Sequence, residues 1–202
     1  MDLKETYNLM ADEWTDGHYG SWGQESINKF VALFLSGSEI LDLGCGSGIR
    51  SKVLSDAGLK VLGIDFAEKM IVNAGEKVPN AEFKVLDIRE IQFLKKKFDG
   101  VFAMAILLHF TKKEIPDLLN NIMSIINDGG YLYLTLKEQK GKEKDEKIIR
   151  KDVNGIEMSR FFSLFKLGEI KRELEKINME IVYEEILKMR SRNWIILIAR
   201  KI

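Results

Sequence analysis

Apolar residues along this chain follow two periods, which alternate from one segment to the next. Short apolar runs, as at 40–43 and 98–104, have the length and composition of buried parallel strands. Between such runs lie segments in which apolar residues recur every three or four positions, as in amphipathic helices. Strands that alternate with helices in this way predict an α/β fold built around a parallel sheet.

From these periods, and from the turn signals between the segments, we predict the helices and strands of the chain. Helices are expected over 2–12, 26–35, 49–57, 66–77, 113–126 and 167–177. Strands are expected over 40–43, 60–64, 81–86, 98–104, 131–137, 180–187 and 194–199. The sequence Asn127-Asp128-Gly129-Gly130 is expected to stop the fifth helix before the fifth strand begins. The charged tract 137–152 contains few large apolar residues, so we expect a mobile loop or a solvated helix there.

A glycine-rich loop joins the first strand to the helix that follows it. Its sequence is Gly44-Cys45-Gly46-Ser47-Gly48, which allows a sharp turn and leaves room for a ligand. The N-terminus of the following helix offers free N–H groups and the positive end of the helix dipole. The next strand ends on Asp65, whose carboxylate lies about 20 residues beyond the first glycine, where it can accept hydrogen bonds from ribose hydroxyls. The unit therefore predicts a nucleoside site.

The glycine spacing helps to distinguish between nucleosides. The dinucleotide-binding pattern is G-x-G-x-x-G, in which the third glycine lets helix and strand pack closely around a pyrophosphate. In this chain Gly44 and Gly46 fit the pattern, but Ile49 occupies the third position. This departure counts against a nicotinamide oxidoreductase, which stays open as an alternative.

Several motifs resemble those of one enzyme family. The segments E-x-L-D-L-G-C-G-S-G at 39–48 and G-I-D-F-A-E-K-M at 63–70 resemble motif I and its sequel in class I S-adenosylmethionine (SAM) dependent methyltransferases. The segment at 98–109 resembles the family's F-D-x-V-x-x-x-x-x-L-x-H pattern, and Tyr7, Ala11 and Trp14 match its N-terminal Y-x-x-x-A-x-x-W spacing. An R-F-F-x-x-F segment at 160–165 is also similar to one that members carry ahead of the last helix. The resemblance covers nearly the whole chain.

The resemblance implies a Rossmann-like, doubly wound α/β fold. Its sheet has seven strands in the order 3-2-1-4-5-7-6, with the last strand antiparallel, helices on both faces and an N-terminal helical lid. The chain is then a single domain over 1–202. Its parts are the lid at 1–36, a SAM-binding core at 37–137, and a polar insertion, last helix and terminal strand pair at 138–202.

The resemblance also implies a cofactor site for SAM, with S-adenosylhomocysteine (SAH) as the product and no metal. In the family Asp87 accepts a hydrogen bond from the adenine amino group and Ile88 packs on the ring, although Asp87 is alternatively a helix N-cap. Asp42 either orients the loop or binds the methionine ammonium, while Cys45 is interpreted as a small residue in a tight turn rather than a nucleophile. The candidate cofactor residues are Asp42, Gly44, Cys45, Gly46, Gly48, Asp65, Phe66, Met70, Asp87, Ile88, Ala103 and Met104.

The acceptor of the methyl group is expected among aromatic and polar residues near both ends of the chain. The candidates are Tyr7, Trp14, His18, Tyr19, Trp22, His109, Arg160 and Phe161. Aromatic walls suit an apolar or cationic small molecule, whereas Arg160 suits an acidic one. Two alternatives stay open: these rings pack a lid onto the core, and His109 is a structural histidine bonded to the backbone.

Composition narrows the possible partners. The 31 basic and 31 acidic residues balance, so no global field favours nucleic acid, and no apolar run approaches a membrane span. One cysteine and two histidines count against a disulfide or a metal site and suit a reducing cytoplasm. We therefore expect a cytoplasmic monomer or homodimer that methylates a small molecule, with no nucleic-acid or membrane partner. The alternative from another class is a non-catalytic SAM-binding sensor or partner subunit.

Overall fold

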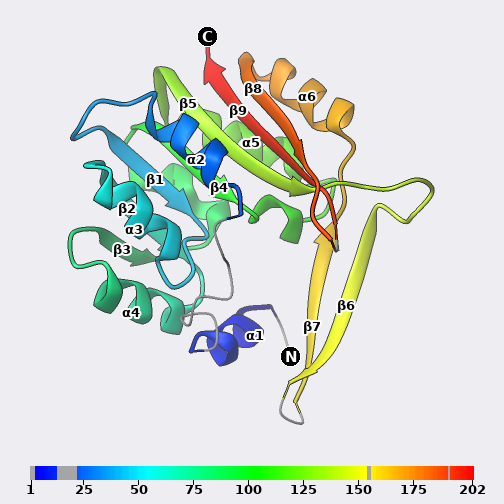
Figure 1. The fold of residues 1–202 in the computed structure, drawn as a ribbon. Coiled ribbons are helices and arrows are strands. Elements are labelled where there is room, and N and C mark those ends of the chain that lie inside the picture. Colours follow the sequence, from blue (N-terminus) through cyan, green and yellow to red (C-terminus); the bar gives the residue numbers. More distant parts are fainter. Residues whose placement is uncertain (1–2, 13–21, 154–155, 191) are drawn as a thin grey trace.

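A seven-stranded sheet forms the centre of the molecule. The computed structural model describes residues 3–12, 22–153, 156–190 and 192–202 (Figure 1). The strands of this sheet, in spatial order, are β3 (Glu82–Val85), β2 (Lys60–Asp65), β1 (Glu39–Leu43), β4 (Phe98–Met104), β5 (Ile126–Lys137), β9 (Trp194–Lys201) and β8 (Met179–Leu187). The strands from β3 to β5 pair in parallel, and β9 runs antiparallel to both of its neighbours. The expected order, with an antiparallel last strand, is confirmed.

Helices cover both faces of this sheet (Figure 1). The α-helices are α1 (Leu3–Met10), α2 (Gln24–Val31), α3 (Ile49–Asp56), α4 (Glu68–Lys77), α5 (Ile115–Ser124) and α6 (Leu167–Lys176), and two 3₁₀ segments are η2 (Ile88–Leu94) and η3 (Leu107–His109). Successive residues of a strand pack into the hydrophobic cores on opposite faces of the sheet, because side chains alternate across a strand. In β4, Val101 packs with α5 and α6, whereas Phe102 packs with α2 and α3. None of the helices within the described residues is long and apolar enough to cross a membrane.

The charged tract at 137–152 is not the mobile loop or solvated helix that the sequence predicts. Its second half forms β6 (Glu146–Val153), which pairs antiparallel with β7 (Ile156–Ser163) in a separate two-stranded ribbon. The ribbon projects from the sheet beside α1 (Figure 1). The apolar signal was weak because Ile148 and Ile149 are adjacent rather than alternating, and both are exposed. Pairing with the aromatic strand β7 therefore decides the conformation of this segment.

The boundary between α5 and β5 also differs from the prediction. The helix ends at Ser124 and β5 starts at Ile126, which pairs with Phe98, so residues 127–130 lie inside the strand. They form an irregularity before the ladder resumes at Gly100 and Tyr131. The irregularity is held by the side chain of Asn127, whose Nδ2 donates to Asp99 Oδ1 at 2.9 Å. The second helix is likewise shorter than the expected 26–35, because α2 ends at Val31.

The core depends on a stack of rings on the α2 side of the sheet. Phe102 is fully buried, its ring stacks on Tyr133 at 4.4 Å, and Phe30 lies 5.6 Å from it. We expect Phe102→Ala to lower the free energy of unfolding by about 3–5 kcal/mol through lost burial and a residual cavity. Denaturant unfolding at equilibrium measures this change.

Phe93→Ala is the matched control, because the Phe93 side chain is 70% exposed. Its loss should stay within about 0.5 kcal/mol. Similar losses in the two variants would show that the ring stack does not carry the stability assigned to it.

Candidate functional site

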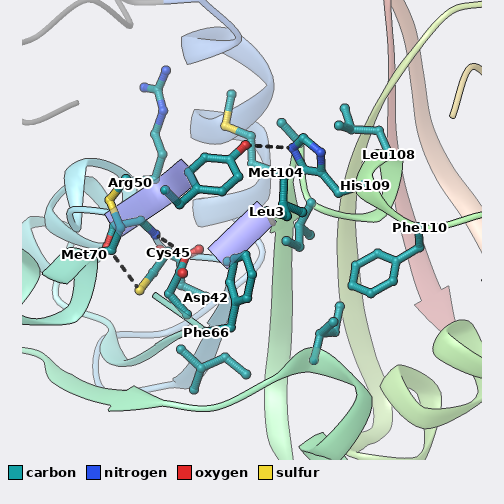
Figure 2. Close-up of a pocket in the computed structure, with 18 of the residues that line it drawn as sticks. Leu3, Asp42, Cys45, Arg50, Phe66, Met70, Met104, Leu108, His109 and Phe110 are labelled. Carbon is teal, nitrogen blue, oxygen red and sulfur yellow. Dashed lines mark hydrogen bonds between the residues drawn. The ribbon is translucent and has the colours of Figure 1, made fainter. Parts of the chain in front are cut away.

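A cavity of about 560 Å³ opens where β1, β2, β4 and β5 reach their carboxyl ends. This is where open parallel sheets bind ligands, because the loops that leave the strands diverge there. The helix α1, the first turn of α4 and the strand β7 also contribute residues to its lining. Figure 2 shows several of the lining side chains. Of the residues predicted for a site, those that line it are Tyr7, Trp22, Asp42, Gly44, Cys45, Gly46, Asp65, Phe66, Met70, Asp87, Ile88, Met104, His109 and Arg160.

The glycine loop forms one wall of this cavity. Gly44, Gly46 and Gly48 all have left-handed backbones, with φ of 66°, 53° and 80°. A Cβ on Gly44 would lie 2.7 Å from Ile106 Cδ1, so the loop approaches the neighbouring strand end too closely for a side chain. Gly48 lies behind the cavity, where a Cβ would be 3.1 Å from that of Ala74, and it leads into α3. Gly44, Cys45 and Gly46 thus face a ligand, while Gly48 lets the loop pack on α4.

Two buried carboxylic acids lie beneath the loop. Asp65 Oδ2 accepts from the Gly46 N–H at 3.1 Å, and its Oδ1 accepts from the Ala67 N–H at 2.9 Å. Asp42 Oδ2 accepts from the Ser51 hydroxyl at 2.6 Å. Burial raises the pKa of Asp65 to about 6 and that of Asp42 to about 7. The acid at the tip of β2 therefore fixes the loop and still borders the cavity.

Asp87 is the helix N-cap that was one of its two predicted roles, and its role toward adenine stays a prediction. It caps η2, since Oδ1 accepts from the Arg89 N–H at 2.8 Å, and it pairs with the Arg89 guanidinium at 3.0 Å. It also lines the cavity, next to the buried side chain of Ile88. Ala103 does not reach the cavity because it faces the α5 core, so Met104 and Ala105 form the wall at the end of β4.

Tyr7 and His109 form a hydrogen-bonded pair at the side of the cavity away from the loop. His109 Nδ1 lies 2.9 Å from the carbonyl oxygen of Phe161, which can only accept, so Nδ1 carries a proton. Nε2 lies 2.9 Å from the Tyr7 hydroxyl (Figure 2) and accepts from it. Burial lowers the pKa of His109 to about 4 and raises that of Tyr7 to about 12, so both are neutral near pH 7. His109 is therefore both bonded to the backbone and exposed to the cavity.

The strand β7 presents Arg160 and Phe162 to the cavity, while the Phe161 side chain does not line it. Adjacent side chains of a strand point to opposite sides, so only one phenylalanine of the pair can face the ligand. Trp22 lines the cavity with its ring 4.7 Å from that of Trp194. The other acceptor candidates, Trp14, His18 and Tyr19, lie outside the described residues.

Sequence reasoning missed two cationic residues of the cavity. Lys137, the last residue of β5, points its ammonium at the Phe162 ring, 3.5 Å from the centroid. Arg50, in the first turn of α3, lines the cavity beside the loop and donates to the Trp22 carbonyl at 3.2 Å. Lys137 could have been found from its place at the carboxyl end of a predicted parallel strand.

The strand order, the glycine loop and the acid after β2 define the fold of class I SAM-dependent methyltransferases. Residues 40–130 match a family model described as a methyltransferase domain. This match agrees with the resemblance of the motifs, and the fold is the one found in SAM-dependent methyltransferases.

Relatives and solved structures agree with this assignment. A ubiquinone biosynthesis O-methyltransferase of Coxiella burnetii is 30% identical over 110 residues, which are 51% of this chain and 45% of the relative. The chain thus matches about half the length of that curated relative. A SAM-dependent methyltransferase from Methanosarcina mazei superposes with a TM-score of 0.74 at 24% identity, covering 88% of this chain and 97% of the other. Magnesium protoporphyrin IX methyltransferase from Synechocystis with bound SAM gives 0.70 at 19% identity, covering 100% and 98%. These two similarities show the fold.

The close approach at Gly44 gives a test of the loop geometry. Gly44→Ala adds a Cβ at positive φ and forces the Ile106 side chain to move, so we expect a loss of stability of about 2 kcal/mol or more. Gly141→Ala is the control: it also has positive φ, at 57°, but a Cβ there meets nothing within 4 Å. Thermal and denaturant unfolding compare the two variants. Equal losses would show that only the backbone conformation, and not the tight packing, constrains Gly44.

Proposed function

We propose that this protein transfers the methyl group of SAM to a small-molecule acceptor. The observation that carries the proposal is that loop glycines and the buried Asp65 border one cavity at the strand ends. The volume of about 560 Å³ lies in the range of small-molecule sites and exceeds the needs of a fragment-sized ligand. When bound, SAM supplies a methyl group on a positively charged sulfur, which is already activated for transfer.

The residues around the loop fit the parts of such a ligand. The Asp65 carboxylate is placed to accept from ribose hydroxyls, and Asp87 with Ile88 suits the adenine ring. Asp42, in its ionised form above a pKa of about 7, puts negative charge near the ammonium of the methionine tail. Arg50, beside the loop, supplies positive charge for the carboxylate of that tail. The match of donors and acceptors around one cavity supports SAM rather than a pyrophosphate.

The chain's own contribution to the reaction is positioning and exclusion of water. Holding two reactants in line supplies much of the rate in a displacement of this kind. His109 and Tyr7 are both uncharged near pH 7, and their hydrogen bond fixes the ring orientations at the cavity wall. A base is needed only where the acceptor carries a proton at attack. The absence of an obligatory catalytic group among the described residues therefore does not count against an enzyme.

The class of acceptor, the cellular compartment, the division of the chain and the oligomeric state are predictions. The balanced charge of the chain supports a small-molecule acceptor over nucleic acid. The single cysteine supports a reducing compartment such as the cytoplasm. The division into an N-terminal lid, a SAM-binding core and a C-terminal part, and the monomeric or homodimeric state, also stay predictions.

Binding of SAH tests the proposal directly. At a concentration 100 times its dissociation constant, SAH should raise the melting temperature by about 5–10 °C through mass action. Asp65→Asn keeps the shape but removes the charge and one of the two oxygens that accept from the backbone, so we expect about 10- to 100-fold weaker binding by titration calorimetry. Asp56→Asn is the control, since Asp56 is exposed on α3 and pairs only with Lys52. Failure of the wild-type protein to bind SAH would remove the proposed function.

The pKa of Asp65 predicts a pH dependence of this binding. Ribose hydroxyls donate to the ionised carboxylate, and the raised pKa of about 6 means that protonation competes as the pH falls through 6. SAH affinity should fall about tenfold between pH 7 and pH 5, with Asp42 acting in the same direction. His109 stays neutral over this range because its pKa is lowered to about 4. The decline should be shallower in Asp65→Asn, and an unchanged slope would mean that another group controls binding.

A further inference from the structure

The cavity carries opposite charges over different strands. The carboxylates of Asp42 and Asp65 lie at the ends of β1 and β2. The cations of Lys137 and Arg160 line the same cavity from β5 and from the ribbon strand β7. In the sheet β4 separates β1 from β5, so the two groups of charges border different parts of the cavity. The part near β5 therefore suits a group of negative charge.

The two cations meet at one aromatic ring. The Lys137 ammonium lies 3.5 Å from the centroid of the Phe162 ring, and the Arg160 guanidinium carbon lies 5.5 Å from it. Arg160 also lies near Tyr7, where its positive charge acts against the burial that raises the pKa of the phenol. Neither cation forms an ion pair with any carboxylate of the described residues, whereas Lys112, in the turn before α5, pairs with Glu169. The two cations thus share the Phe162 ring, and neither is paired with an acidic side chain of the described residues.

The surroundings of Lys137 disfavour its charged form. Burial, and then repulsion from Arg160, Arg192 and Lys147, lowers its pKa to about 8. An anion held between Lys137 and Arg160 would offset both effects by supplying the missing counter-charge. Partly buried cations close to each other and short of an acidic partner are typical of sites for acidic ligands.

We propose that the methyl acceptor carries an oxyanion group, a carboxylate or a phosphonate, which Lys137 and Arg160 bind. The apolar part of the acceptor packs on the rings of Phe162 and Trp194, which line the cavity beside Lys137. This inference rests on the proposed function, because it names the class of substrate for the same site. Of the acceptors that the sequence left open, an acidic one fits the two cations. A cationic acceptor would need only the aromatic walls.

One competing role for these cations is to hold the carboxylate of the SAM methionine tail. Arg50 already lies beside the glycine loop, on the α3 side of the cavity, and is closer in the fold to that tail. The two roles make different predictions for variants of Lys137. Loss of its charge weakens binding of an acidic acceptor in one case and of SAH itself in the other.

The experiment measures binding of small acidic probes to the SAH-saturated protein and to the protein without SAH. Benzoate and phenylphosphonate carry the proposed group, and benzamide is a neutral match for benzoate in size and shape. Dissociation constants come from NMR titrations of the ¹⁵N-labelled protein. We expect both anions to bind the wild-type protein at least about tenfold more tightly than benzamide does.

Lys137→Met and Arg160→Met remove each charge while keeping a long apolar side chain, so folding should be retained. Each should reduce the preference for the anions about 10-fold or more, with the SAH affinity unchanged. Lys60→Met is the control, since Lys60 is an exposed cation at the opposite, amino end of β2, and it should keep the full preference. Thermal unfolding verifies that all variants are folded.

Three results would overturn the inference. They are equal binding of benzoate and benzamide by the wild-type protein, an anion preference that survives in both variants, and a loss of SAH affinity in Lys137→Met. Because the wild-type protein is first titrated with SAH alone, failure of the proposed function is seen separately. If SAH binds and the anions are not preferred, only the acidic acceptor is excluded.

Discussion

The hydrogen bonds between the Asp65 carboxylate and the loop backbone are the interaction on which the site depends. A buried acid that accepts from Gly46 and Ala67 joins the end of β1 to the end of β2. The bonds require a loop that passes close to its neighbours, which explains why Gly44 has no room for a side chain. The cavity wall is therefore set by backbone geometry and a single side chain, and it can be rigid before any ligand arrives.

Burial controls protonation throughout the cavity, and in different directions for different groups. Desolvation pushes acids and bases toward their neutral forms, which is why the pKa of Asp42 rises to about 7 while that of His109 falls to about 4. The imidazole and phenol side chains are thus uncharged near pH 7, Asp42 is only partly ionised, and charge is concentrated at Asp65 and at the cations near β5. A polarised cavity of this kind orients an elongated ligand or a pair of ligands.

Local patterns were sufficient to predict most of the fold, because β4 and its neighbours are buried strands with strong apolar runs. The spacing from the glycine loop to Asp65 likewise predicted that the loop and this acid border one cavity. The acceptor end depends on contacts between distant segments, which no local pattern records. Phe162 rather than Phe161 faces the cavity because alternate side chains of β7 point to the same side as Arg160. This register depends on pairing with β6, a segment for which the sequence predicts a loop or a helix. Lys137 was missed because a terminal lysine on a strand resembles an ordinary solvated residue.

The ribbon of β6 and β7 is separate from the main sheet, yet it supplies Arg160, Phe162 and the carbonyl that orients His109. The wall that we propose for the acceptor thus lies largely on a separate ribbon, whereas the loop and the acid proposed to hold the nucleoside belong to the main sheet. Changes in the ribbon can retune chemical preference with little disturbance of the scaffold beneath it. A substitution on the ribbon side of the cavity would thus change the fit of one ligand without touching the loop that borders the other.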